Sequence, residues 1–500
     1  MKILNAKQIY QADKETIKIK SISSNELMEF AAMKCFDWFN KYYSDKNNVI
    51  HIFCGIGNNG GDGLVMARKL IQSDYQVQTY IVNFSDKRSS DFKINLERLV
   101  QMSHKPIDLY ETNDFPEISD KDIVIDAIFG IGLTRPPQGL VLDVIQKINN
   151  IKTTVISIDF PSGLYSEASV KDKNSVIKAS NTLTFQNPKL AFLLAENQRY
   201  SENWEVIDIG LDQAFIDSVN SDFQTVEHEL VNSIHKPRSK FSHKGTFGHS
   251  LIIGGSFGKI GAVVLASKAA LKIGSGLVTA YIPKCGYTIV QTSIPEVMVE
   301  VDDENYLQHF NYKTKANVIG IGIGLGTHLK TKRGFVKFLK ENNIPLVIDA
   351  DALNIIAEHN DILNLIQEDT ILTPHPKEFE RLAGNWKNDY DKINKQLEFS
   401  LKFKCIVVLK GVYTSIAYKG KIYFNTTGNP ALATAGSGDV LTGIITGLIA
   451  QGYSPINACI FGVYLHGKSA DLAINESQSM ESFTASNCID YFGRAFQEIF

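Results

Sequence analysis

Short apolar runs rich in β-branched residues alternate with longer segments of helical period along most of the chain. Such runs are typical of buried strands, and strands separated by helices are typical of a parallel sheet covered on both faces. The pattern therefore predicts an α/β protein. The helix of the first half is predicted over residues 61–71, and the strands are predicted over residues 49–54, 77–82, 123–128, 154–158, 181–185, 205–209, 250–254, 277–282, 318–321, 346–348 and 406–409.

The strand pattern stops between the two halves of the chain. Residues 212–242 are polar and contain no strong strand pattern. A chain of 500 residues has room for two or three domains, each with its own core. We place a boundary near residue 216, and no convincing internal repeat relates the halves. Two different α/β domains are expected, over residues 1–216 and 217–500.

Composition and charge argue against three classes of protein: nucleic-acid-binding, secreted and membrane-spanning proteins. The formal net charge of −3 gives no basic surface for nucleic acid, and residues 235–240 are predicted to be a solvated linker. Residues 1–20 have no apolar core typical of a signal peptide, and no run reaches the ~18 apolar residues of a membrane span. Residues 440–450 are apolar but shorter, and predict a buried helix. Neither nucleic acid nor a membrane is expected as a partner.

The six cysteines are scattered along the chain and form no CxxC pair. Several of them lie in apolar runs, which favours reduced thiols in the core. Reduced thiols predict a cytoplasmic protein.

A glycine-rich segment, residues 55–63 (GIGNNGGDG), lies between a predicted strand and a predicted helix. Gly55, Gly57 and Gly60 match the dinucleotide pattern GxGxxG. Glycines let the backbone approach a ligand, and a helix start offers free N–H groups to phosphate. A close-packed turn without a ligand would also contain such glycines. The position between strand and helix favours nucleotide or phosphate binding.

Polar side chains follow three of the predicted strands. The carboxyl ends of neighbouring parallel strands converge on one crevice, so Asn59, Asp126 and Ser162 are expected to lie close together. Their oxygen atoms suit a hard cation. The alternative is that Asp126 and Asp159 only cap helices.

Four segments, residues 25–31 (NELMEFA), 57–63 (GNNGGDG), the loop after Asp126 and residues 159–163 (DFPSG), resemble the NAD(P)H-hydrate epimerase family. The resemblance covers most of residues 1–210 and implies a Rossmann-like three-layer sandwich. Ile56 stands where the family usually has proline. The resemblance implies that potassium is bound by Asn59, Asp126 and Ser162. It further implies that the damaged nucleotide contacts Asn58, Asn59, Gly60, Gly61, Asp62, Gly130, Ile131, Gly132, Leu133, Thr134, Arg135, Pro136 and Asp159.

The reaction of that family needs few groups. The hydrate carries a hydroxyl on the carbon next to the ring nitrogen, and the nitrogen lone pair can open that centre so that re-addition inverts it. A positioned acid–base group and a held phosphate are enough. Our hypothesis is that Asp159 is the acid–base group.

Two segments of the second half, residues 427–430 (TGNP) and 435–443 (AGSGDVLTG), predict a turn that opens a helix. The backbone N–H groups at such a turn can form an anion hole for a phosphoryl group. Asp439, in the first helical turn, can then take a proton from the hydroxyl being phosphorylated. As an alternative, Asp439 is only a helix-start carboxylate stabilised by the helix dipole. The upstream loop and the long apolar helix favour the kinase-type site.

Six further segments complete a second resemblance: residues 242–248, 254–262, 320–326, 349–352, 373–378 and 410–414. In this order they resemble the ADP/ATP-dependent NAD(P)H-hydrate dehydratase family, a ribokinase-like α/β/α fold, over about residues 235–500. Ile323 and Ala435 depart from the proline and glycine usual in the family. The resemblance implies that Ala262, Gly324, His375 and Asp439 contact the hydrated nucleotide, and that ADP is held by Lys410, Gly411, Val412, Tyr413, Thr414 and Gly438. From the residues alone, His375 is either a buried structural imidazole or a ligand contact, and Lys410 alone would be a surface lysine.

Together the resemblances imply a bifunctional repair enzyme for hydrated NADH and NADPH. The first domain is expected to epimerise the R and S hydrates. The second is expected to phosphorylate the S hydrate with ADP, giving AMP, and to release phosphate and NAD(P)H, with magnesium on the phosphates. A homo-oligomer is expected.

Three other functions stay open from the residues. The anion hole would equally serve a kinase of a small vitamin-like alcohol with a non-catalytic N-terminal module. The GxGxxG pattern would suit an NAD-dependent dehydrogenase, but no acidic residue clearly ends the strand over residues 77–82, since Asp86 lies beyond it. A non-catalytic scaffold is disfavoured by two polar site constellations.

Overall fold

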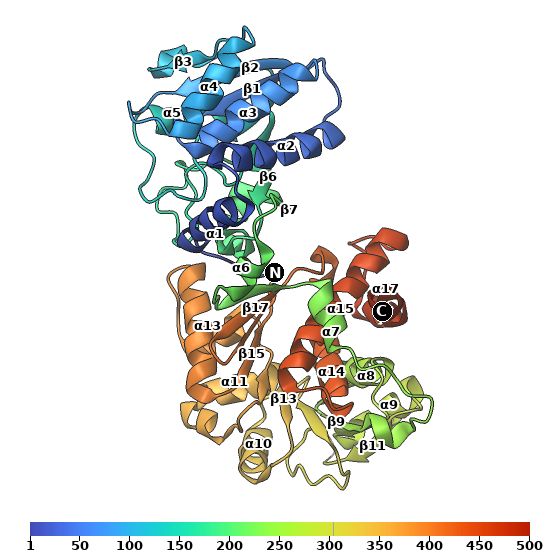
Figure 1. Ribbon diagram of the computed structural model, residues 1–500. Helices are drawn as coiled ribbons and strands as arrows, with labels where there is room; N and C mark the ends of the chain where they lie inside the picture. The colour runs from blue at the N-terminus through green and yellow to red at the C-terminus, as the bar shows by residue number, and fades with distance from the viewer. Residues whose placement is uncertain (304) are drawn as a thin grey trace. The chain divides into compact units, whose positions relative to one another are not determined.

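The computed structural model describes residues 1–303 and 305–500, and it divides the chain into two compact units (Figure 1). The N-terminal unit comprises Met1–Ser221 and Asn388–Tyr390, and the C-terminal unit comprises Asp222–Lys387 and Asp391–Phe500. Each unit has its own sheet and its own hydrophobic core. In the described part of the chain, no helix combines the length and the apolar character that a membrane span needs.

The N-terminal unit is built on a seven-stranded parallel sheet of order β3-β2-β1-β4-β5-β6-β7. Because the strand order reverses between β1 and β4, a crevice is expected outside their carboxyl ends. The strands are β1 Val49–Cys54, β2 Gln76–Val82, β3 Ile107–Leu109, β4 Ile123–Ala127, β5 Thr154–Ile158, β6 Ala179–Phe185 and β7 Ser201–Ile207.

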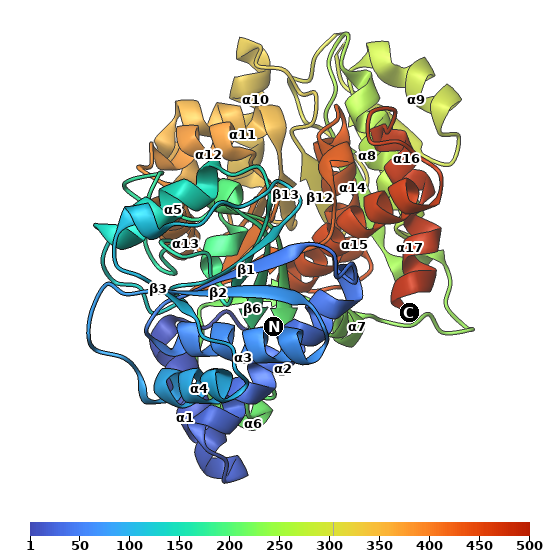
Figure 2. The same cartoon turned by 90° about the horizontal axis from the view of Figure 1, so that it is seen from above.

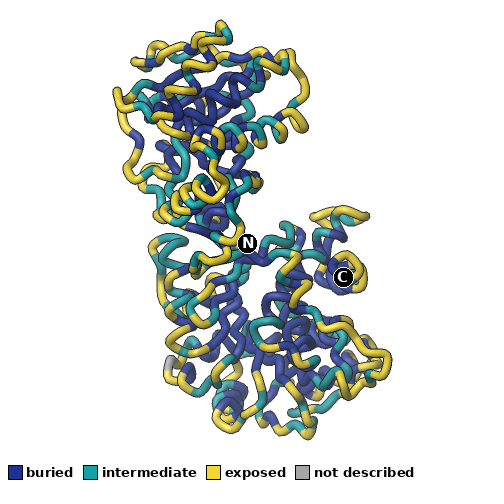
Figure 3. The backbone as a smooth tube through the Cα atoms, viewed as in Figure 1, coloured by how far each residue is buried: buried dark blue, intermediate teal, exposed yellow. Residues whose placement is uncertain are grey.

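Helices cover both faces of this sheet. Alternate residues of β1 point to opposite faces, so Ile52 packs in a cluster with helices α1 to α4, and Phe53 packs in a cluster with α5. The interior between these layers is buried (Figure 3). The helices are α1 Ala6–Lys20, α2 Ser24–Tyr42, α3 Asn58–Gln72, α4 Ser90–Gln101, α5 Leu140–Asn150 and α6 Gln213–Ser218.

The C-terminal unit is built on a ten-stranded sheet of order β11-β10-β9-β12-β13-β14-β15-β16-β17-β8. The strands from β11 to β15 are parallel, β16 is antiparallel to both neighbours, and β8 is parallel to β17. The strands are β8 Phe223–Val226, β9 His249–Ile253, β10 Leu277–Ile282, β11 Met298–Val301, β12 Val318–Ile321, β13 Leu346–Ile348, β14 Ile371–Leu372, β15 Ile406–Leu409, β16 Ser415–Tyr418 and β17 Lys421–Asn425.

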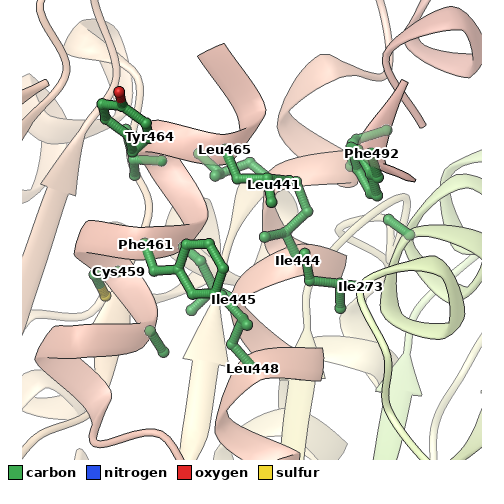
Figure 4. Close-up of a cluster of buried hydrophobic side chains, with 14 of the residues drawn as sticks. Ile273, Leu441, Ile444, Ile445, Leu448, Cys459, Phe461, Tyr464, Leu465 and Phe492 are labelled. Atoms are coloured by element: carbon green, nitrogen blue, oxygen red, sulfur yellow. The ribbon is translucent and has the colours of Figure 1, made fainter. Parts of the chain in front are cut away.

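Helices also cover both faces of this sheet, with α10 to α13 on one side of β12 and β13 and α8, α14 and α15 on the other (Figure 2). Helix α14 is buried almost throughout, and its apolar side chains pack against α15 and the C-terminal helices (Figure 4). The helices are α7 His228–Ile234, α8 Ile260–Lys272, α9 Tyr287–Ser293, α10 Leu329–Glu341, α11 Ala350–Glu358, α12 Pro376–Ala383, α13 Asp389–Phe403, α14 Ser437–Ala450, α15 Pro455–Glu476, α16 Ala485–Asp490 and α17 Phe492–Ile499.

The predicted α/β class is confirmed, as is the buried helix over residues 440–450. One prediction about the polar stretch is wrong, since residues 212–242 contain β8 at the edge of the C-terminal sheet. This strand has four residues, and its partner β17 lies far along the chain, so local hydrophobicity does not reveal it. Six predicted strands match residue for residue: 49–54, 154–158, 277–282, 318–321, 346–348 and 406–409.

Candidate active sites

The glycine segment of the N-terminal unit joins β1 to α3. A Cβ at Gly60 would lie 1.8 Å from the carbonyl oxygen of Gly55, so the turn closes only with glycine at that position. Gly57 precedes the helix in an extended conformation and without a side-chain cap, which leaves N–H groups free at the helix start. The prediction that the helix begins at residue 61 is wrong by three residues. It begins at Asn58, because Gly60 and Gly61 are required there by close packing despite their low helix propensity.

Asp126, near the carboxyl end of β4, is in direct contact with Ser162, in the segment after β5. The fully buried Asp126 carboxylate accepts hydrogen bonds from Ser162 Oγ (2.5 Å), Ser162 N (2.9 Å) and Ser157 Oγ (2.7 Å). Ser162 Oγ in turn accepts one from Phe129 N (2.8 Å). Burial raises the pKa of Asp126 above its ordinary value, and these hydrogen bonds oppose the rise only in part. Asp126 lies within β4, and no described helix begins at Asp126 or Asp159, so the alternative that these two residues only cap helices is wrong.

Asn59 lies in the first turn of α3 and is 9% exposed. Its Oδ1 and Nδ2 are both buried without a hydrogen-bond partner among the described residues. Its Oδ1 is 3.5 Å from the point that a Cβ on Gly130 would occupy, and Asp159 Oδ2 is 2.8 Å from the same point. Buried amides without partners are rare and call for a ligand, water or ion. The Asn59 side chain thus faces the loop after β4 and lies near Asp159.

Asp159 follows β5 in the left-handed conformation, with φ of 61°. Strained backbone of this kind in a non-glycine residue gathers at functional sites. Its Oδ2 accepts a hydrogen bond from Ile131 N (3.0 Å), which ties the loop after β4 to the site. Leu133 is half-buried in that loop, and the remaining predicted contacts, Gly132, Thr134, Arg135 and Pro136, are exposed.

Two charged residues of this site were missed from the sequence. Lys189, after β6, is 1% exposed, donates to the carbonyl oxygens of Phe185 (2.7 Å) and Asn187 (2.9 Å), and lies 3.7 Å from Asp159 Oδ1. Burial, followed by the charge of Asp159, raises the pKa of Asp13 to about 6, and Lys189 opposes this. The position of Lys189 directly before the apolar run at residues 190–195 was a visible signal. Asp13, on an amphipathic helix, gave none.

Asp62 also belongs to this buried group of carboxyls. Burial and then the charge of Asp159 raise the pKa of Asp62 well above its ordinary value. The site therefore combines several carboxyls of raised pKa with one buried ammonium.

In the C-terminal unit, Gly436 precedes α14 with φ of +86°, and a Cβ there would lie 2.4 Å from Leu265 Cδ1. Helix α14 then begins at Ser437 without a side-chain cap. Its inner face carries Leu441, Ile444 and other apolar residues of the core, which fix the position of the helix (Figure 4). Ser437 N and Val440 N donate to Thr434 O (3.4 Å) and Gly436 O (3.0 Å), so the N–H groups of Gly438 and Asp439 between them are the ones offered to an anion.

A buried carboxylate positions a lysine at this helix start. Asp349, at the end of β13, accepts hydrogen bonds from Lys410 Nζ (2.9 Å) and Thr442 Oγ1 (2.8 Å). Lys410 Nζ lies 3.2 Å from the point that a Cβ on Gly438 would occupy. The ammonium and the free amides thus converge on one place, which suits a phosphoryl group.

Asp439 lies half-buried in the first turn of α14, as predicted from the motif. Burial and then the charge of Asp349 raise the pKa of Asp439 to about 6, and Lys410 opposes the rise. A carboxylate with a pKa close to neutral can accept a proton at physiological pH and release it readily.

A cavity of about 660 Å³ opens beside the start of α14, a size typical of cofactor and nucleotide sites. Part of its wall is the loop at residues 427–430, which α15 holds: Gly428 N and Asn429 Nδ2 donate to Asp471 (2.8 and 2.9 Å). A Cβ at Gly467 would lie 2.3 Å from Thr427 Oγ1, so this contact requires glycine on the helix. The predicted residues that line the cavity are Lys410, Gly411, Val412, Thr414, Gly438 and His375, whereas Tyr413 is not among the lining residues of the described chain.

Ala262 and Gly324 form a separate group. Gly324 has φ of +58°, and a Cβ there would lie 2.6 Å from Lys259 O and 3.3 Å from Ala262 Cβ. Lys259 pairs with Asp351 (3.2 Å), whose charge acts on Asp439. Of the four predicted hydrate contacts, only His375 is among the residues that line the large cavity, and Ala262, Gly324 and Asp439 are not.

Two histidines line the cavity, and only one was predicted. His375 is 46% exposed, and its Nδ1 accepts the N–H groups of Lys377 and Glu378, so the alternative of a buried structural imidazole is wrong. His466, on α15, was missed because a single histidine in an apolar helix resembles a core residue. Its Nε2 is 3.4 Å from Ser437 Oγ, and burial lowers the pKa of His466 to about 4, so its ring is neutral.

The remaining candidate chemistry is limited. All six cysteines are free thiols, five of them buried. Among the residues that the structure describes, no group of three or more His, Cys, Asp or Glu side chains could hold a metal ion.

Two protein-family models match the chain, one in each half. Residues 250–491 match a protein-family model described as NAD(P)H-hydrate dehydratase, and residues 24–191 match one described as YjeF-related protein N-terminus. A solved ADP/ATP-dependent NAD(P)H-hydrate dehydratase from Bacillus subtilis, co-crystallised with ATP/Mg²⁺, is 28% identical, with 55% of this chain and 98% of that chain covered and a TM-score of 0.48.

Curated relatives match across both units. The bifunctional NAD(P)H-hydrate repair enzyme of Moorella thermoacetica is 33% identical over 98% of this chain and 96% of its own length. That of Coxiella burnetii is 34% identical over 92% and 93%, and that of Escherichia coli is 30% identical over 93% and 88%. The chain therefore belongs to the family of bifunctional NAD(P)H-hydrate repair enzymes.

Proposed function

We propose that residues 1–216 form the epimerase domain and residues 217–500 the dehydratase domain of an enzyme that restores hydrated NADH and NADPH. The observation that carries this function is the position of Asp439 in the uncapped first turn of α14, where the charge of Lys410 acts on it and the preceding residue, Gly438, lines the large cavity. A carboxylate there is adjacent to a place where a phosphoryl group would be stabilised.

In the dehydratase domain, Asp439 takes the proton of the hydrate hydroxyl, whose oxygen attacks the terminal phosphorus of ADP as AMP leaves. The free amides of α14 and Lys410 balance the charge that develops on the phosphoryl oxygens. The nitrogen lone pair of the hydrate ring then expels phosphate, and loss of a neighbouring proton restores the dihydropyridine. Gly411 and Gly438 let ADP approach the backbone, and Val412 and Thr414 line the same cavity. The proposed contacts of the hydrate are Ala262, Gly324 and His375.

In the epimerase domain, Asp159 is the proposed acid–base group. Its carboxylate is held by Ile131 N and faces the buried ammonium of Lys189. The free amides at the start of α3 are suited to the substrate phosphates. The loop at residues 130–136 covers the reacting ring.

Potassium is the proposed ion of this domain, with Asn59, Asp126 and Ser162 as its ligands. The buried Asn59 amide without a partner supports this, and a cation there would offset the cost of burying Asp126. Magnesium is proposed to arrive with the phosphates of ADP, since the described residues offer no acidic cluster for it.

A cellular location and an oligomeric state are also proposed. The six free thiols support a cytoplasmic location. The homo-oligomer stays a prediction.

One assay tests the function. Purified protein is mixed with both epimers of NADH hydrate, ADP and magnesium, and the recovery of dihydronicotinamide absorbance is followed. Complete recovery is expected, with one AMP and one phosphate formed for each NADH. Without ADP, recovery should stop while epimer exchange continues. Phosphorylation of a small alcohol with no change in either hydrate would instead support the kinase alternative.

Removal of potassium should slow epimerisation and leave dehydration of the S hydrate unchanged. The Asn59→Ala variant is expected to need about ten-fold more potassium for half-maximal exchange, because one oxygen ligand is lost. Asn203→Ala is a matched control, since this asparagine is exposed at the start of β7 and contacts Ser180 O. Equal potassium dependence in all three proteins would exclude Asn59 as a ligand.

A further inference from the structure

The segment after β2 contacts both of the loops assigned above to the epimerase substrate. Ser89 N donates to Ile56 O (3.0 Å) in the glycine segment. The ring of Phe84 packs edge to face against that of Phe129, with centroids 5.2 Å apart, at the start of the loop after β4. Residues 83–89 therefore form the next wall of the same crevice.

A cavity of about 390 Å³ lies at this segment, large enough for a nucleoside. Two of its side chains are exposed aromatics, Phe84 (40% exposed) and Tyr110 (64% exposed). Flat aromatic faces that are open to solvent suit stacking against a planar base. Its lining residues are Asn83, Phe84, Ser85, Asp86, Arg88 and Tyr110.

Arg88 gives this cavity a positioned cation. Its guanidinium donates to Asn83 Oδ1 (2.7 Å) and lies 3.8 Å from Asp108 Oδ1. Asn83 Nδ2 also donates to Asp108 (2.8 Å), so the three side chains hold one another in place. A guanidinium fixed in this way can bind phosphate oxygens through two N–H groups.

Strand order shows which part of a dinucleotide reaches this cavity. Asp126 lies near the end of β4 and Asp159 follows β5, on one side of β1, and the cavity lies at the ends of β2 and β3, on the other side. With the pyrophosphate at the start of α3, a dinucleotide whose reacting ring faces Asp159 must extend its other half over β2 and β3.

We propose that this cavity binds the adenosine half of the hydrate during epimerisation, with Phe84 and Tyr110 beside the adenine and Arg88 at the 2′-phosphate of NADPH hydrate. The inference rests on the proposed epimerase function and adds a specificity site to it. NADH hydrate lacks the 2′-phosphate, so Arg88 distinguishes the two substrates.

Steady-state epimerisation of each hydrate by the full chain tests the inference. Arg88→Gln is expected to raise KM for NADPH hydrate about ten-fold and to change KM for NADH hydrate less than about two-fold. Arg88→Lys should restore part of the loss, because it keeps the charge. Phe84→Ala should raise KM for both hydrates about three- to ten-fold. Tyr42→Ala is the matched aromatic control, because Tyr42 is exposed at the end of α2, before β1 begins.

Equal effects of Arg88→Gln on both hydrates would overturn the assignment of the 2′-phosphate, and unchanged KM values in Arg88→Gln and Phe84→Ala would overturn the subsite. Titration calorimetry with adenosine 2′,5′-bisphosphate separates this inference from the epimerase function. A binding component that is lost in Arg88→Gln and kept in Tyr42→Ala is expected, even from a chain that does not epimerise. Identical isotherms for these proteins would contradict the inference.

Discussion

Replacing Asp439 with asparagine should reduce dehydration of the S hydrate by about 10²- to 10⁴-fold, the usual contribution of a general base. The amide has nearly the shape of the carboxylate but cannot accept the hydroxyl proton. Epimerisation should be unchanged, because the groups assigned to it lie in the other unit. The measurement is the rate of NADH recovery from pure S hydrate with saturating ADP and magnesium, with epimer exchange as the internal control.

The same residue predicts a pH profile. Asp439 is protonated, and inactive as a base, below its raised pKa of about 6, so dehydration should increase as pH rises through about 6. Asp349→Asn should move this limb to lower pH, because the Asp349 charge is the largest neighbouring cause of the raised pKa. An unchanged limb in Asp349→Asn, or wild-type dehydration in Asp439→Asn, would contradict the proposed role of Asp439.

Replacing Asp159 with asparagine should slow epimerisation by about 10²- to 10⁴-fold and leave dehydration of the S hydrate intact. The R hydrate would then persist after all S hydrate has been restored, which chromatographic separation of the epimers would detect. Asp120→Asn is the matched control, since Asp120 lies exposed in a turn of the same unit.

Lys189→Met tests the contribution of the buried ammonium beside Asp159. Loss of this ammonium, whose nitrogen lies 3.7 Å from Asp159 Oδ1, should slow epimerisation and leave dehydration of the S hydrate unchanged. Full epimerisation in Asp159→Asn would refute the assignment, and the acid–base group would then be sought among the neighbouring carboxyls, Asp13 and Asp62.

The sequence predicted those parts of the fold and sites that depend on local pattern. Long apolar strands and the glycine turn before Asp439 are encoded within a few residues, and the parallel arrangement brings Asp126 to Ser162. Strands β3, β8, β11, β14, β16 and β17 were missed because two to five residues carry little pattern and their pairing partners stabilise them. Lys189 and His466 were missed for a related reason: each acquires its role only when distant segments pack around it.

Gly60 and Asn59 are neighbours in the sequence, but the structure constrains the first and the ligand the second. The first is required by backbone contact alone, since even a methyl group there would overlap the carbonyl of Gly55. The second has buried polar atoms that make no hydrogen bond to any described residue. A descendant of this enzyme that had ceased to act on nucleotides would still need the glycine in order to fold, whereas it would be free to exchange the asparagine. The glycine pattern in a related chain therefore indicates that the fold is kept, whereas an asparagine at position 59 indicates that the activity is kept.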